Sequence, residues 1–74
     1  MRVQVACFAS LSGFTPPDGR MELDAGSTPR DIIHTLGISE KDVKIVFVNG
    51  QNAHPDTRLS DNDRVGLFPA IGGG

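Results

Sequence analysis

The sequence predicts an α+β domain in which one helix packs across a mixed sheet of four to five strands. The 74 residues leave room for a single modest core. Segments with the two-residue hydrophobic period of strands lie near both ends of the chain. One well-capped helix lies between them. A helix this short is not stable alone, so we expect it to lie across the sheet.

The first two predicted strands cover residues 2–10 and 21–25. Apolar residues alternate with polar or small ones, namely Val3, Val5 and Cys7 in the first strand and Met21 and Leu23 in the second. Residues 12–19, between them, are rich in Gly and Pro and predict a loop. We therefore expect an antiparallel hairpin with a long tip.

The predicted helix begins after Thr28, a good N-cap residue. Pro29 suits the first helical position, and Asp31 stands where a capping-box acid closes the first turn. Gly37 ends the helix. Its buried side is predicted to consist of Ile32, Ile33 and Leu36.

The next predicted strand is residues 44–48, which contain four consecutive apolar residues. Such a run without alternation is typical of a central strand covered on both faces. Asn49-Gly50 follows and predicts a tight hairpin turn. We therefore expect a short strand to pair with 44–48.

The last predicted strand is residues 64–68, after a turn in which Asn62 tolerates a left-handed backbone. Pro69 ends the strand because it has no N–H to donate. With period two, Leu67 faces the core and Phe68 faces outward. The order of elements predicts a β-grasp domain over residues 1–69.

Composition excludes several classes of function. Seven basic and nine acidic residues give a net charge of -2 without clustering, so we expect neither nucleic acid nor a membrane as partner. No apolar run approaches the roughly 20 residues that span a bilayer, which favours a cytoplasmic protein. Cys7, His34 and His54 lack a close ligand spacing, so we expect no metal site. So small a core favours a carrier or binding module over an enzyme.

The final ten residues carry no charged side chain. Residues 70–74 read Ala-Ile-Gly-Gly-Gly, and we expect them to form a flexible tail. A stalk of glycines is slender enough to thread a narrow channel in another protein.

Three segments resemble the MoaD/ThiS family of ubiquitin-like sulfur-carrier proteins, closer to the small subunit of molybdopterin synthase. They are Val48-Asn49-Gly50, the Leu-x-Asx-x-Asp-x-Val turn of 59–65, and the Phe-Pro followed by terminal glycines in 67–74. Residues 7–11 are similar to the first strand of that family. The resemblance implies a ubiquitin-like β-grasp fold and a chemistry at Gly74, whose carboxylate is adenylated and converted to a thiocarboxylate. Adenylation makes chemical sense because a carboxylate is a poor electrophile without a good leaving group.

The resemblance also implies two kinds of partner. One is a ubiquitin-activating-type adenylyltransferase (MoeB/ThiF-like), which uses ATP and Mg, so the chain itself holds no stable cofactor. The other is a sulfur-accepting synthase subunit (MoaE-like or ThiG-like). The residues expected to contact these partners are Gly73, Gly72, Ile71, Phe68 and Pro69.

The sequence leaves the pathway open. Phe68-Pro69 favours molybdopterin or tungstopterin synthesis, whereas three terminal glycines favour thiamin thiazole synthesis. Pro69-Ala70 departs from the two prolines usual in molybdopterin carriers. The same sequence is also compatible with a ubiquitin-like modifier of lysines and with a plain β-grasp binding module.

Overall fold

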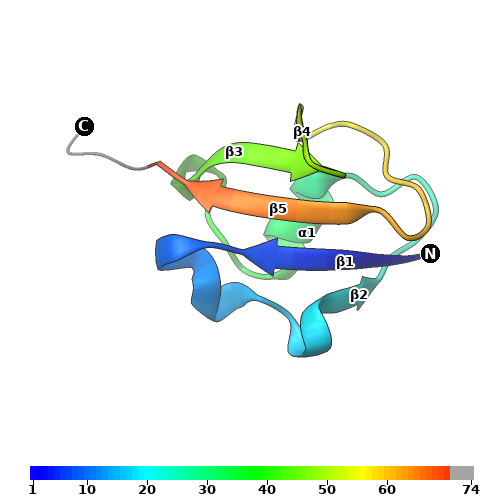
Figure 1. Ribbon diagram of the computed structural model, residues 1–74, viewed down its shortest axis with the longest axis horizontal. Helices are drawn as coiled ribbons and strands as arrows, with labels where there is room; N and C mark the ends of the chain where they lie inside the picture. Colours follow the sequence, from blue (N-terminus) through cyan, green and yellow to red (C-terminus); the bar gives the residue numbers. More distant parts are fainter. Residues whose placement is uncertain (71–74) are drawn as a thin grey trace.

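The computed structural model describes residues 1–70. It confirms the α+β prediction: a five-stranded mixed sheet in the order β2-β1-β5-β3-β4, with one α-helix behind it (Figure 1). The elements are β1 (Arg2–Cys7), β2 (Arg20–Glu22), α1 (Pro29–Thr35), β3 (Val43–Val48), β4 (Gln51–Ala53) and β5 (Arg64–Pro69). The first and last strands, β1 and β5, pair in parallel at the centre of the sheet, and the other pairings are antiparallel.

The helix has the caps that the sequence predicts. The Thr28 side chain accepts a hydrogen bond from the backbone of Asp31, and the Asp31 carboxylate accepts one from the Thr28 backbone at 2.9 Å. Gly37, with φ of 80°, reverses the chain after the helix. Ile32 and Ile33 are buried against the sheet, and Leu36 is half-buried.

Both central strands alternate between buried and exposed residues, so one face of each contributes to the core. The core consists of Val3, Val5, Cys7, Leu11, Ile32, Ile33, Ile38, Val46, Leu59, Val65 and Leu67. We call the opposite face of the sheet the outer face, and no helix of residues 1–70 covers it (Figure 1).

The predicted turns are also present. Asn49 and Gly50 have φ of 54° and 81° between β3 and β4, and Asn62 has φ of 70°. The strand predicted over 2–10 ends at Cys7, and a 3-10 helix, η1 (Ala9–Phe14), begins within its predicted range and continues into the loop expected at 12–19. A second 3-10 helix, η2 (Pro17–Gly19), lies in that loop, and a third, η3 (Glu40–Asp42), precedes β3. Left-handed backbone at these turns is why Asn and Gly occupy them.

The prediction that 44–48 is covered on both faces is wrong. In β3 only Val46 is buried, and the outward residues Ile45 and Phe47 are partly exposed. The central strand is β5, and β3 lies one strand from the edge. The apolar run therefore reflects an exposed apolar surface on the outer face, and not a second buried layer.

The domain predicted over 1–69 ends with β5 at Pro69. Ala70 is exposed and outside any strand. The rest of the tail predicted as flexible, residues 71–74, lies outside the described part of the chain. No helix within residues 1–70 has the length and apolar character needed to cross a lipid bilayer.

Candidate functional site

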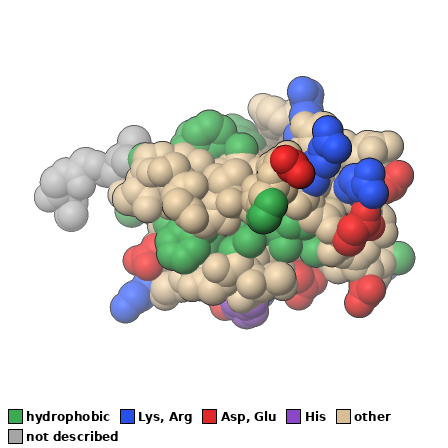
Figure 2. Space-filling view, turned by 90° about the horizontal axis from the view of Figure 1, so that it is seen from below, with side chains coloured by type: hydrophobic (Ala, Val, Ile, Leu, Met, Phe, Trp, Pro, Cys, Tyr) green, Lys and Arg blue, Asp and Glu red, His purple; other side chains and the backbone are tan. Residues whose placement is uncertain are grey.

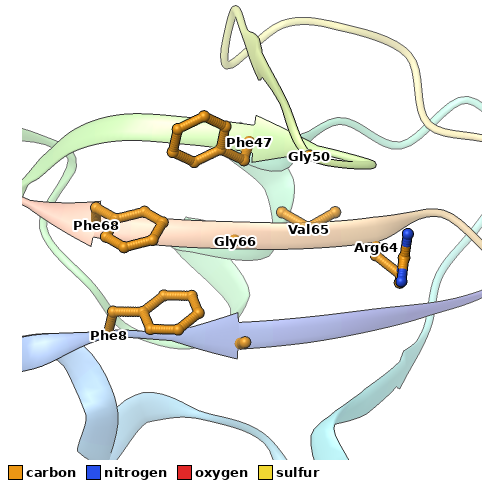
Figure 3. Close-up of a pocket in the computed structure, with 8 residues that line it drawn as sticks. Phe8, Phe47, Gly50, Arg64, Val65, Gly66 and Phe68 are labelled. Atoms are coloured by element: carbon orange, nitrogen blue, oxygen red, sulfur yellow. The ribbon is translucent and has the colours of Figure 1, made fainter.

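Three aromatic rings from adjacent strands meet on the outer face, beside the C-terminal end of β5 (Figure 3). Phe8 and Phe68 stack with ring centroids 4.3 Å apart and planes 4° apart. Phe47 meets Phe68 edge-on at 5.4 Å and 82°. Such pairs contribute about 0.5–1.5 kcal/mol each beyond the area they bury. The rings therefore form an ordered apolar surface.

Gly66 forms the floor of a groove between these rings. A Cβ atom added there would lie 3.4 Å from Cε2 of Phe8, 3.5 Å from Cε1 of Phe68 and 3.7 Å from Cβ of Phe47. The open hollow has a volume of about 380 Å³. We call these four residues the aromatic groove, and its floor is open because Gly66 has no side chain.

The backbone after β1 places Phe8 in this groove. Phe8 continues the parallel pairing by donating its N–H to the Leu67 carbonyl at 3.1 Å. Ala9 then has φ of 52°, an unfavourable value for a residue with a side chain. This turn leaves Phe8 41% exposed on the outer face and buries Leu11 in the core. Strained backbone of this kind is typical of functional positions.

The orientation predicted for the last strand is confirmed. Leu67 has no exposed surface, and Phe68 lies on the outer face, partly exposed. Pro69 is buried and pairs with Val43 at the end of the ladder. The partner contacts of Phe68 and Pro69 stay predictions. Ile71, Gly72, Gly73 and Gly74 lie outside the described residues, so their roles stay predictions too.

Phe8, Phe47 and Gly66 were not predicted as site residues. Each of the three has a feature in the sequence that could have marked it as a site residue. Phe8 breaks the alternation of apolar and polar residues that begins at Val3, Phe47 lies in an apolar run, and Gly66 lies inside a predicted strand. A glycine inside a strand often marks close approach by another group. Only the pairing of β1, β5 and β3 brings the three positions together.

Cys7, His34 and His54 do not form a metal site among the described residues. Cys7 is buried, His34 contacts Glu40 at 2.6 Å, and His54 accepts a hydrogen bond from the Asp56 backbone within a turn. Among residues 1–70, no three His, Cys, Asp or Glu side chains are grouped to hold a metal ion. These side chains therefore add no chemistry to the aromatic groove.

We predict that Cys7 is unreactive in the folded protein. Burial raises the pKa of its thiol, with a smaller opposing effect from the hydrogen bond to Thr15. The thiolate is the reactive form, so little of it is present at neutral pH. Alkylation by iodoacetamide at pH 7 should be slow in buffer and fast in denaturant. Equal rates in both conditions would contradict the burial of this thiol.

A mixed five-stranded sheet with one helix across it is the architecture of ubiquitin-like β-grasp proteins. The sequence model of the ThiS family matches residues 5–74. The chain therefore belongs to the ThiS family, within the MoaD/ThiS group of ubiquitin-like sulfur carriers. Members of this group are small carrier proteins and not enzymes.

Solved structures share this fold. The putative molybdopterin converting factor subunit 1 of Pyrococcus furiosus is 30% identical, with a TM-score of 0.73, and the alignment covers 96% of this chain and 99% of that one. SAMP1 of Haloferax volcanii is 20% identical with a TM-score of 0.74, and both chains are covered completely. A protein-protein complex of subunits 1 and 2 of the Helicobacter pylori molybdopterin-converting factor contains a chain 22% identical, with a TM-score of 0.62 and complete coverage of both chains. None of the curated proteins compared with the chain gives a match.

Proposed function

We propose that this protein carries sulfur as a thiocarboxylate on Gly74 and delivers it to the synthesis of molybdopterin or tungstopterin. The observation that carries the proposal is the position of the aromatic groove in a ThiS-family chain. Phe68 and Phe8 lie on the exposed face where β5 leads into the glycine tail. The groove is suited to dock an enzyme that acts on the tail.

The reaction takes two steps. The Gly74 carboxylate attacks the α-phosphate of ATP on the partner adenylyltransferase, which gives an acyl adenylate and releases pyrophosphate. A sulfur donor then supplies hydrosulfide, which attacks the acyl carbon, displaces AMP and leaves a thiocarboxylate. Mg on the partner offsets the phosphate charge. This chain supplies the acyl group and the docking surface, and the partner supplies the catalytic groups.

The length of the tail links the docking surface to the chemistry. Four residues follow Ala70, and they span at most about 14 Å when fully extended. An enzyme whose active site holds Gly74 must therefore lie against the end of β5. Among residues 1–70, the aromatic groove provides an exposed apolar surface at that end.

The likeness to the Pyrococcus furiosus protein, together with Phe68-Pro69, favours the pterin pathway over the thiazole pathway. The two pathways are separated by incubating the thiocarboxylated protein with a molybdopterin-synthase large subunit and, in parallel, with a thiazole synthase, each together with its sulfur-accepting substrate. We expect the mass of the protein to return to that of the carboxylate only with the first. Sulfur loss only to the thiazole synthase would assign the other pathway, and isopeptide adducts on lysines without a thiocarboxylate would make the protein a modifier.

We predict that Gly66→Val blocks docking without unfolding the domain. The φ of Gly66 is outside the left-handed range, and valine favours strands, so the backbone accepts the change. The added methyl groups fill the groove that the three rings enclose. The Kd for the activating enzyme should rise at least about tenfold, or about 1.4 kcal/mol, with an unchanged melting temperature.

Gly66→Ala is the matched control for this substitution. Its single Cβ stands at contact distances of 3.4–3.7 Å from the rings and leaves most of the groove open. Calorimetry with the activating enzyme should give a Kd close to that of wild type. If Gly66→Val binds as tightly as Gly66→Ala, the groove is not the docking site.

A further inference from the structure

Two arginines lie side by side with one glutamine on the outer face. Gln4 of β1 pairs with Arg20 of β2 on one side and with Arg64 of β5 on the other. Residues paired directly across strands have their side chains on the same face of a sheet. All three are exposed, so they form a row across three adjacent strands, which we call the arginine row.

Neither arginine of the row has an acidic partner among residues 1–70. The other strand and helix arginines of that range do form close ion pairs: Arg2 contacts Glu22 at 2.7 Å, and Arg30 contacts Asp56 at 2.7 Å. No carboxylate of the described residues lies within 4 Å of Arg20 or Arg64.

An open hollow lies along the arginine row. Its volume is about 460 Å³, and its lining includes Gln4, Thr15, Asp18, Arg20 and Arg64. Asp18 is the one carboxylate that the described residues contribute to that lining, and it forms no ion pair with either arginine. A protein of net charge -2 thus presents two cations beside one recess, without a carboxylate partner in the described part of the chain.

The arginine row is continuous with the aromatic groove. Arg64 lines both hollows, and Figure 3 shows it on β5 beyond Gly66, on the side away from Phe68. Figure 2 shows an apolar patch along the upper edge of the molecule and basic side chains to its right. A partner that covers the groove therefore meets the arginines next.

We propose that the arginine row binds carboxylate side chains of the enzyme that adenylates Gly74. This inference rests on the proposed function. The aromatic groove and the tail fix that enzyme at one end of the outer face. A contact between the arginine row, farther along β5 and β1, and carboxylates of the enzyme would fix the orientation of the carrier on the enzyme. Arginine suits this role because its guanidinium presents several donors in a fixed plane to a carboxylate.

Contacts of this kind at the edge of an interface act mainly on the rate of association and its salt dependence. The double charge reversal Arg20→Glu/Arg64→Glu should therefore raise the KM for the carrier at least about tenfold at low salt, with kcat within about twofold of wild type. Increasing salt should lower kcat/KM for wild type and leave the variant nearly unaffected. The measurement is pyrophosphate release by the cognate activating enzyme with ATP, at several carrier and salt concentrations.

The control is Lys41→Glu/Arg58→Glu, which changes the net charge by the same amount. Lys41 lies on η3 beside α1, and the Leu59 N–H next to Arg58 donates to Ser27 just before α1, so both lie toward the helix side. Both side chains are exposed. The KM of the activating enzyme for this control variant should stay within about threefold of that for wild type, because the substituted side chains do not face the partner.

Four outcomes would overturn the proposal. Equal KM values for the two double variants would mean that net charge, and not the row, decides affinity. Dimers of wild type that the Arg20→Glu/Arg64→Glu change dissociates in sedimentation would assign the row to a second copy of this chain. No pyrophosphate release with wild type would contradict the proposed function itself, whereas normal wild-type turnover with an unchanged KM in the row variant would overturn this inference alone.

Discussion

We expect Gly73→Val to abolish formation of the thiocarboxylate while the domain stays folded. A β-branched side chain at this position widens the stalk and restricts its backbone angles, whereas glycine passes a narrow channel. Gly73 is four positions after Pro69 in the sequence, where the last described strand ends, so we expect the unfolding transition in urea to match that of wild type. The measurement is the intact mass of the protein after incubation with the activating enzyme, ATP and a sulfur source.

The length of the tail matters as much as its width. Deleting Gly74 shortens the reach by about 3.5 Å, and a misplacement of about 1 Å already costs about a hundredfold in rate. One alanine added after Gly74 moves the carboxylate past the ATP. An extended protein that is thiolated as well as wild type would contradict the role of Gly74.

Leu67→Ala should act mainly on stability, and Phe68→Ala should act mainly on activation. Leu67 has no exposed surface, so its truncation leaves a cavity and should cost about 2–4 kcal/mol in the free energy of unfolding. Phe68 lies partly exposed on the outer face, and its truncation should cost about 1–3 kcal/mol from the two lost ring pairs. Its effect on the KM for adenylation should be at least about tenfold, because aromatic residues in such surfaces carry much of the binding energy.

Urea unfolding and steady-state adenylation of the two variants form the test. Each variant serves as the control for the other, since the two residues are neighbours on one strand and face opposite sides. If Phe68→Ala unfolds more easily than Leu67→Ala and is adenylated normally, the aromatic groove serves stability and not docking.

Local signals were sufficient to predict most of the fold. The helix is specified by Thr28 and Asp31 at its start and Gly37 at its end, and all three act as predicted. The turn at Asn49-Gly50 follows from backbone preferences that belong to the two residues themselves. Each of these features depends on neighbours in the sequence, so the sequence alone reveals it.

The candidate site could be predicted only in part, because its residues are distant in the sequence and are brought together by the pairing of strands. Phe8 and Phe68 are 60 positions apart in sequence, and they stack only because β1 and β5 pair in parallel. The exposure of Phe47 depends on the outer face being uncovered, which hydrophobic period does not reveal. A buried strand and a strand that carries a docking surface have the same apolar run, and this is why the prediction for β3 was wrong.

The most direct measurement of the central claim is the mass of the C-terminal peptide after the activation reaction. Wild-type protein is incubated with its activating enzyme, ATP and a sulfur source, digested, and analysed by mass spectrometry. We expect the peptide that ends at Gly74 to gain the mass difference between sulfur and oxygen, and to lose it again when a sulfur-accepting synthase and its substrate are added. An unchanged C-terminal peptide, or sulfur found instead as a persulfide on Cys7, would contradict the account.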